Sequence, residues 1–176
     1  MPIMRRTPWF DRRFPLIEDN GLLPGILERL DGTASRLRLL LDGIERASPV
    51  ESGWSTAQEV GHLIDLEPLW LQRVHDIMRG EPVLTVADLS NRATHEGDHD
   101  RWPVPHLVER FQQARRGLVS ALRGASDGDL ERSARHPRLG TPMRLIDLAY
   151  FVAEHDDHHL ARLRELTDDA RNRHRP

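Results

Sequence analysis

The chain has 176 residues, of which 38% are hydrophobic, 30% charged and 5% aromatic, with a formal charge of −3 and no cysteine. This length favours one domain with a substantial core, and the few aromatic residues disfavour a sheet protein. The negative charge argues against a nucleic-acid partner, which usually meets a basic face. Without cysteine, disulfides, cysteine-based zinc sites and a cysteine nucleophile are excluded.

The N-terminal segment shows no export or membrane signal. Arg5 and Arg6 precede a polar stretch rather than an apolar one, and no apolar run approaches membrane-spanning length. We therefore expect a cytoplasmic protein that binds no membrane. Residues 1–20 are polar and interrupted by proline, and we expect them to form an extended arm that packs on the body through its aromatic side chains.

Two helices are predicted in the first half of the chain. Apolar residues at alternating steps of three and four predict a helix from Asn20, as its N-cap, to about Arg46. A second helix should open at Ser55, which forms a capping box with Gln58, and end at Gly80.

Two further helices follow a long polar connection, residues 81–104, of a length that is uncommon without a function. The third helix should run over 105–123 and be closed by Gly124. After a second polar loop, Thr141 and Pro142 predict the start of the fourth helix, because proline is well tolerated in a first helical turn.

The four helices predict an all-α fold, a four-helix bundle with a long crossover between helices 2 and 3. Each helix carries one apolar stripe, and we expect the four stripes to face one core. Residues 21–168 would form this single domain, preceded by the arm and followed by a charged, frayed tail over 169–176.

Three histidines are candidate metal ligands. His155 and His159 are four residues apart on the fourth helix, which stacks both rings on its core-facing side. His62 faces the core from the second helix. Three neutral imidazoles can hold one divalent cation and leave a position open for water or substrate. This requires the start of the second helix to meet the later part of the fourth, which spacing alone does not fix.

Metal-bound histidines need a partner for their second nitrogen. Glu59, Asp65, Glu154 and Asp156 are near in sequence, and the pattern does not choose among them. Three of these, Asp65, Glu59 and Asp156, are also candidates for a general base. We expect His158 to point to solvent beside Glu154, one turn before it.

The connection between helices 2 and 3 contains a second histidine pair, His95 and His99. It is interpreted as a polar surface loop or as a lid over the mouth of the triad, with a second metal site as the alternative. The remaining histidines have no partner at ligand spacing and are expected at the surface: His75, His106, His136 and His174.

Two sequence segments resemble the signatures of the DinB/YfiT-like superfamily, and the resemblance extends roughly from Leu22 to Leu166. One segment lies on helix 2 and the other on helix 4. The residues that carry the resemblance are Trp54, Ser55, Glu59, His62, Leu63, Glu67, Trp70 and Arg73 on helix 2, and Glu154, His155 and His159 on helix 4.

The resemblance implies an up-down-down-up four-helix bundle, often a homodimer, with a divalent metal held by His62, His155 and His159. Zinc or nickel is the favoured ion, with iron or manganese as alternatives. It further implies a metal-dependent hydrolase, or a transferase that uses a low-molecular-weight thiol such as mycothiol or bacillithiol, acting on a small molecule. Because the chain lacks cysteine, such a thiol must come from a co-substrate.

Two other functions remain open at this point. A di-iron carboxylate bundle needs glutamates on two helices and Glu-x-x-His on the other two. Glu59 precedes His62 at that spacing, but the fourth helix offers only Asp156 before His159, and no carboxylate falls on the inward stripes of helices 1 and 3. The other possibility is a non-catalytic bundle that binds a small ligand or partner protein and uses the ion structurally.

Overall fold

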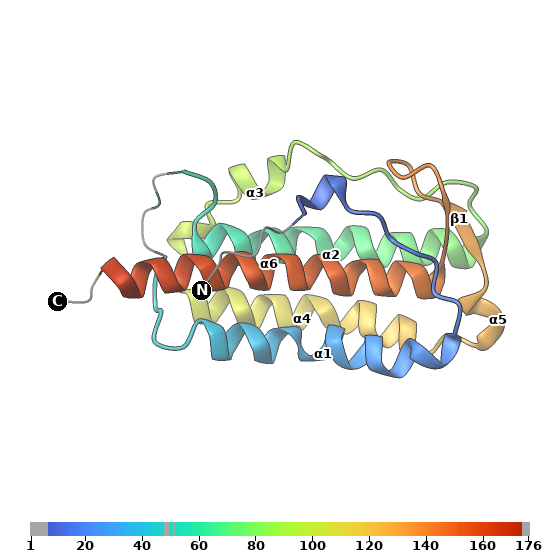
Figure 1. Ribbon diagram of the computed structural model, residues 1–176, viewed down its shortest axis with the longest axis horizontal. Coiled ribbons are helices and arrows are strands. Elements are labelled where there is room, and N and C mark those ends of the chain that lie inside the picture. Colours follow the sequence, from blue (N-terminus) through green and yellow to red (C-terminus); the bar gives the residue numbers. More distant parts are fainter. Residues whose placement is uncertain (1–6, 48–49, 51, 174–176) are drawn as a thin grey trace.

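Four long helices lie side by side in the computed structural model, which describes residues 7–47, 50 and 52–173, without the side chains of 169–173 (Figure 1). They are α1 (Leu23–Leu40), α2 (Thr56–Arg79), α4 (Val104–Arg123) and α6 (Leu145–Arg173). The predicted all-α bundle is confirmed. The connecting elements are η1 (Trp9–Asp11), η2 (Asn20–Leu22), α3 (Arg92–Glu96), η3 (His99–Arg101), α5 (Asp127–Leu130), β1 (Ser133–Arg135) and β2 (Pro142–Arg144).

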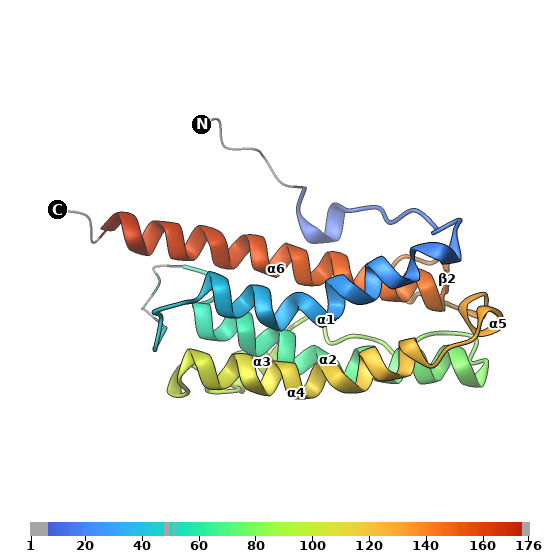
Figure 2. The same ribbon diagram turned by 90° about the horizontal axis from the view of Figure 1, so that it is seen from below.

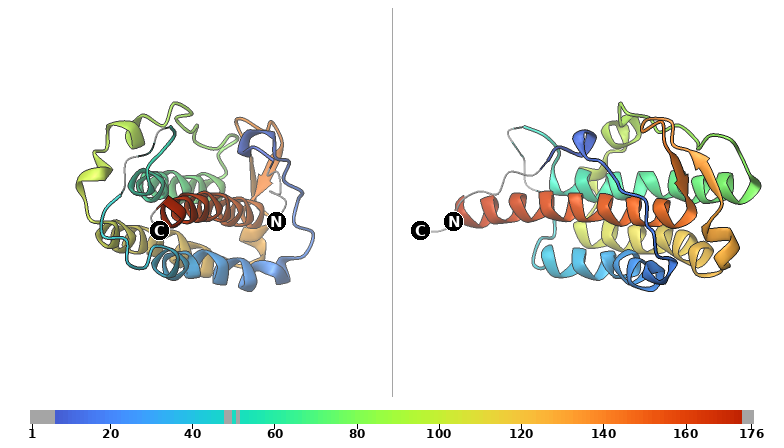
Figure 3. Two further views of the ribbon diagram at one scale, coloured as in Figure 1. Left: turned by 60° about the vertical axis from the view of Figure 1, so that its left-hand side comes forward. Right: turned by 45° about the vertical axis from the view of Figure 1, so that its right-hand side comes forward.

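The helices follow an up-down-down-up order. Helices α1 and α6 run in one direction, and α2 and α4 run in the other (Figures 1 and 2). Helix α2 packs against α4 and α6, and α1 packs against the same two helices. Because α2 and α4 are parallel neighbours, the chain between them must return along the length of the bundle. This crossover, residues 80–103, carries α3 and η3 past α2 (Figure 3).

Helix α2 begins and ends as predicted. The Ser55 hydroxyl accepts the Gln58 N–H at 3.1 Å, while the Gln58 side chain accepts the Ser55 N–H at 3.0 Å. Gly80 ends the helix at φ 76°, a left-handed conformation that glycine adopts without strain. The capping box fixes the first turns of α2, which include His62.

Helix α1 is shorter than predicted. It ends at Leu40 rather than near Arg46, and Gly43 then takes a left-handed φ of 75°. The predicted N-cap was also wrong: Asn20 lies in η2, and the preceding Asp19 caps that turn. The apolar spacing predicted too long a helix because Leu41 and Ile44, which follow the last helical turn, still pack in the core.

Helix α6 begins at Leu145 rather than at Thr141 and Pro142. Pro142 lies in β2, which pairs with β1 as an antiparallel hairpin that the sequence did not predict. Strands of three residues are too short to show a recognisable alternation. The Asp147 carboxylate accepts the Arg144 N–H at 2.9 Å and satisfies a free donor at the helix start.

The described part of the N-terminal arm lies against the bundle next to α6 (Figure 2). Trp9 and Phe14 both pack on Phe151 of α6, with ring centroids 5.1 and 4.7 Å away. Residues 1–6 of the arm and 174–176 of the tail, including His174, lie outside the described residues. Within the described chain no helix is long and apolar enough to cross a bilayer.

A buried ion-pair cluster joins all four long helices. Arg115 of α4, only 3% exposed, donates to Glu67 of α2 at 2.6 Å and to Asp156 of α6 at 2.5 Å. It also donates to the backbone oxygen of Leu30 in α1 at 3.2 Å. Burial alone would lower the pKa of Arg115, but Asp156 and Glu67 raise it above its ordinary value. We refer to Arg115, Glu67 and Asp156 as the Arg115 cluster.

Candidate metal centre

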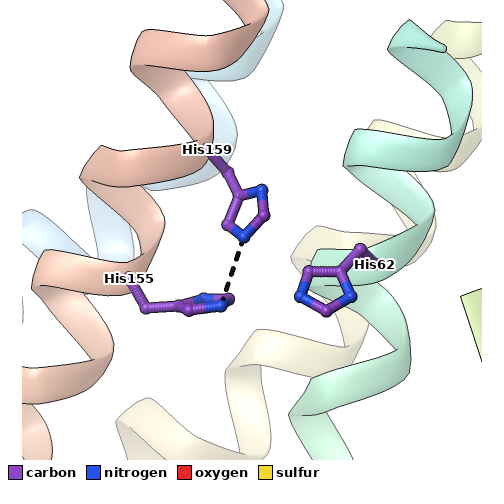
Figure 4. Close-up of side chains that lie close together, drawn as sticks. All are labelled: His62, His155 and His159. Carbon is purple, nitrogen blue, oxygen red and sulfur yellow. Dashed lines mark hydrogen bonds between the residues drawn. The ribbon is translucent and has the colours of Figure 1, made fainter. Parts of the chain in front are cut away.

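The three candidate ligands meet in the interior of the bundle (Figure 4). His62, His155 and His159 are 5%, 4% and 6% exposed, and one nitrogen from each lies within 4.8 Å of the others. Helices α2 and α6 are antiparallel neighbours, so the first turns of α2 lie beside the later turns of α6. The convergence on which the sequence interpretation depended is therefore present. These three residues form the histidine triad.

Glu59 orients His159. Its Oε2 lies 2.6 Å from His159 Nδ1, and the Glu59 side chain is 3% exposed. A carboxylate accepts hydrogen bonds, so Nδ1 carries a proton, and in the neutral, metal-binding form of the ring Nε2 keeps its lone pair. Glu59 stands one turn before His62 on α2, so this helix supplies both a candidate ligand and the partner of another candidate ligand.

His62 is oriented through a hydroxyl. Its Nδ1 lies 3.1 Å from Thr94 Oγ1, and Thr94 donates to Asp65 Oδ2 at 3.0 Å. Because the hydroxyl proton goes to the carboxylate, the hydroxyl oxygen accepts from His62 Nδ1–H. The Nε2 atom of His62 is then left with a lone pair, and its ring is turned toward the other two (Figure 4).

His99 holds this arrangement in place. Its Nε2 donates to Asp65 Oδ2 at 2.9 Å, and its ring lies directly over Gly61. A Cβ at position 61 would lie 2.3 Å from that ring, so only glycine allows the close approach. The crossover therefore contacts α2 beside His62 at two points, through Thr94 of α3 and through His99 of η3.

His155 completes the triad. Its Nε2 donates a hydrogen bond to His159 Nε2 at 3.2 Å (Figure 4), while its Nδ1 is buried and has no hydrogen-bond partner among the described residues. Two nitrogens bound to one zinc ion at the tetrahedral angle and about 2.0–2.1 Å lie about 3.4 Å apart. The observed spacing and the unprotonated Nε2 of His159 fit a shared cation.

The triad favours neutral imidazoles, which are the form that binds metal. Burial, followed by the neighbouring His159, lowers the pKa of His62 to about 3. Burial, His159 and His62 also hold the pKa of His155 well below its ordinary value. At neutral pH both rings keep a lone pair available.

A cavity of about 380 Å³ opens beside the triad, between α2, α6, the N-terminal arm and the crossover. Aromatic and apolar side chains form much of its wall, and its rim includes the exposed Phe10, Val86 and Leu89. A smaller recess reaches the same centre from the side of Glu59 and Arg162. The main cavity is also lined by Trp9, Trp54, Leu66, Trp70, Arg73, His136, Arg138, Phe151 and His158.

Two of the four candidate partner carboxylates are used elsewhere. Glu154 pairs with Arg29 at 2.6 Å, and Asp156 belongs to the Arg115 cluster. The prediction for His158 was wrong, because its ring lines the cavity and packs on Trp9 at 5.7 Å between centroids. Its position beside His159 on α6 turns it toward the arm, which covers this side of the bundle.

The second histidine pair does not converge. His95 is exposed on α3 and His99 is buried against Asp65. Among the described residues, the triad is the one group of three or more metal-binding side chains that lie close enough to share an ion. His75 and His106 are exposed as expected, whereas His136 is 3% exposed, which corrects its expected surface position. The hairpin β1–β2, absent from the prediction, carries His136 inward.

The fold and the centre define a class: a four-helix bundle with a buried three-histidine donor set beside a cavity. A profile of the DinB superfamily matches residues 29–163, and the chain belongs to that superfamily. No curated protein sequence matches the chain.

A solved structure supports the fold. YfiT from Bacillus subtilis superimposes with a TM-score of 0.75 at 19% sequence identity, covering 90% of this chain and 93% of that one. It is described as a probable metal-dependent hydrolase with an unusual four-helix bundle topology.

Proposed function

We propose that this protein binds one divalent metal ion through His62, His155 and His159 and uses it to activate a nucleophile against a small molecule. The observation that carries the proposal is the convergence of three buried imidazoles within 4.8 Å. Two of them have their Nδ1 atoms held by Glu59 and Thr94, which leaves Nε2 free to bind. A bound divalent cation supplies a Lewis acid that makes water or a thiol nucleophilic near neutral pH.

The surrounding residues prepare the centre and confine the substrate. Glu59 and the Thr94–Asp65 pair fix the ring orientations of His159 and His62, as the partners of metal-bound histidines commonly do. The apolar cavity wall holds the carbon skeleton of a substrate and limits water. None of the three candidate general bases is free, because Glu59, Asp65 and Asp156 each already accept hydrogen bonds from protein groups.

Hydrolysis and thiol transfer both fit this arrangement. The description of YfiT favours hydrolysis, and the family resemblance adds a mycothiol- or bacillithiol-type thiol as co-substrate. A centre that borders a cavity favours catalysis over a purely structural ion, since structural zinc sites are closed by four protein ligands. Zinc or nickel is the proposed ion, since imidazole suits both.

Elemental analysis of protein purified without a histidine tag tests the proposal. Wild-type protein and the His75→Ala control, altered at an exposed histidine of α2, should each carry about one transition-metal ion per chain. His62→Ala should carry almost none. Wild-type protein that takes up no metal, or a His62→Ala variant with the same content, would contradict the proposal. A content near two irons per chain would instead favour the di-iron alternative.

A further inference from the structure

A second part of the cavity is lined by cations and hydrogen-bond donors. Arg73 of α2 is 2% exposed, and Arg138 lies in the turn between β1 and β2. Both guanidinium groups border the same cavity as the triad, together with Trp70 and His136. Burying a cation costs free energy unless an anion balances its charge. The carboxylates near Arg73 and Arg138 therefore decide whether the protein itself balances these two charges.

The protein supplies part of that balance. Asp76 interacts electrostatically with Arg73, although its oxygens accept hydrogen bonds from Gln72 and Thr85. Within the described residues, Arg73 forms no ion pair closer than 4 Å; its Nε donates to the backbone oxygen of Thr85. The pKa of Arg73 is lowered to about 10, by burial first and also by Arg138, so it stays charged at neutral pH.

One more carboxylate borders the cavity, that of Asp88. It is exposed, and its oxygens accept hydrogen bonds from Ser90 and from the Arg92 N–H. Arg92 is also the cation next to Asp88, so the negative charge of Asp88 is already offset. The guanidinium groups of Arg73 and Arg138 are then left with the single carboxylate of Asp76, which leaves one positive charge in excess.

Hydrogen-bond donors are in excess as well. Three donors point at His136: the N–H groups of Arg138 and Leu139 at Nδ1 and the Arg73 guanidinium at Nε2, each at 3.2 Å. Burial, followed by Arg73 and Arg138, lowers the pKa of His136 to about 4, so the ring is neutral at neutral pH. A neutral imidazole has one lone pair. Whichever tautomer is present, at least one of these donors lacks an acceptor.

Two other donors have no acceptor at all among the described residues. They are the Trp70 Nε1–H, on a side chain that is 3% exposed, and Arg138 Nη2; both atoms are buried. Buried donors left without a partner are rare in folded proteins because each costs free energy. A ligand that brings a negative charge and several acceptor oxygens would satisfy both excesses.

We propose that Arg73, Arg138, Trp70 and His136 form a subsite for the carboxylate of a small and otherwise apolar substrate. A carboxylate brings the single negative charge that the cluster lacks, and its planar pair of oxygens matches a guanidinium. We refer to these four residues as the carboxylate subsite. The inference deepens the proposed function, because it names the substrate class of the same cavity.

The subsite lies within reach of the histidine triad. The Arg73 guanidinium carbon is 5.4 Å from the centre of the Trp70 ring, and the His155 ring is 5.5 Å from that same centre. Arg73 of the subsite and His155 of the triad therefore pack against the same indole. A molecule anchored by its carboxylate at the subsite can extend along Trp70 and present its reacting end to the triad.

Calorimetric titration with arylalkanoates tests the subsite. The probes are phenylacetate, hydrocinnamate and phenylbutyrate, each paired with its uncharged amide and titrated into zinc-loaded and zinc-free protein. At least one acid should bind with and without zinc, and its amide should bind about tenfold more weakly or worse, as expected for losing a charge-assisted hydrogen bond. Acids and amides that bind alike, or no binding by any acid, would overturn the inference.

Variants separate the subsite from the metal centre. Arg138→Gln, at a partly exposed residue, should weaken acid binding about tenfold or more, with Arg138→Lys in between and zinc content unchanged. Arg135→Gln, on the same hairpin but outside the cavity lining, should bind as the wild type does. Acid binding that is lost in His62→Ala but kept in Arg138→Gln would place the carboxylate on the ion and refute the subsite. Arg138-dependent binding in a protein that takes up no zinc would support the subsite while refuting the proposed metal function.

Discussion

Two buried polar clusters share helices α2 and α6, and they are built in opposite ways. The Arg115 cluster joins a cation to two carboxylates, and every charge has a partner of opposite sign at 2.5–2.6 Å. The histidine triad joins imidazole rings, and a single hydrogen bond of 3.2 Å, between the Nε2 atoms of His155 and His159, links two of them. Adjacent residues of α6, His155 and Asp156, belong to different clusters.

The comparison shows that burial of polar groups does not by itself indicate function. The exposed fractions are similar, 0–3% in the Arg115 cluster and 4–6% in the triad. Every guanidinium nitrogen and carboxylate oxygen of the Arg115 cluster has a hydrogen-bond partner, and the cluster does not line the cavity. The triad has nitrogen lone pairs without a partner and opens onto the cavity. A cluster with unpaired groups at a cavity is where a ligand contributes most, and the following variants test that distinction.

The largest effect on stability is expected from Arg115→Met. The substitution leaves Glu67 and Asp156 buried without a counter-charge, which should lower the free energy of unfolding by about 3–5 kcal/mol. Urea unfolding of the metal-free protein measures it. Arg116→Met, at the exposed neighbour, should stay within about 0.5 kcal/mol of the wild type. A loss under about 1 kcal/mol for Arg115→Met would mean that the cluster does not hold the helices together.

Acid should destabilise the metal-free protein through buried histidines: His62 and His155 of the triad, and also His136, whose pKa is lowered to about 4. The pKa of His62 falls from 6.5 to about 3 on folding and that of His155 falls too, so below about pH 6.5 the unfolded chain binds more protons. Stability should therefore decrease as pH falls from 7 toward 5, by up to about 1.4 kcal/mol per pH unit for each histidine.

Urea midpoints at several pH values measure this slope. His62→Gln should flatten it, because one of the titrating rings is gone, and His75→Gln should not. A metal-free protein whose stability is constant from pH 7 to 5 would show that the rings are not held neutral.

Glu59→Gln should weaken metal binding without abolishing it. The amide still accepts the His159 Nδ1–H but no longer carries the charge that strengthens the ligand, so affinity should fall about tenfold. Competition with a chromogenic chelator measures the affinity. Glu109→Gln, at an exposed residue of α4, serves as the control. Equal affinities for the two variants would remove Glu59 from the metal centre.

The smallest effect is expected from His95→Ala. This ring is exposed and packs against Trp54 at 5.8 Å between centroids, away from the shared nitrogens of the triad. Metal content should stay at the wild-type value. A drop by half would revive the second metal site that the His95 and His99 spacing suggested.

Local signals explain what could be predicted from the sequence. Apolar periodicity located the four long helices, a capping box located the start of α2, and the spacing of His155 and His159 placed both on one face. Boundaries failed where a left-handed glycine or a short strand interrupted a continuing apolar pattern, at Gly43 and Pro142.

The groups that complete the centre depend on contacts between distant segments. Thr94 reaches His62 from the crossover, and Arg115 meets Asp156 from another helix. One local signal was available: Glu59 precedes His62 by three residues and also reaches His159. His136 lacked such a signal, because the turn that buries it is fixed by pairing between β1 and β2.

A crystal structure of the zinc-loaded protein, with anomalous data collected at the zinc edge, tests the central claim most directly. The account predicts one anomalous peak per chain, about 2.0–2.1 Å from the Nε2 atoms of His62, His155 and His159. Zinc-loaded crystals in which the peak lies on other residues, or in which the triad shows no peak, would contradict it.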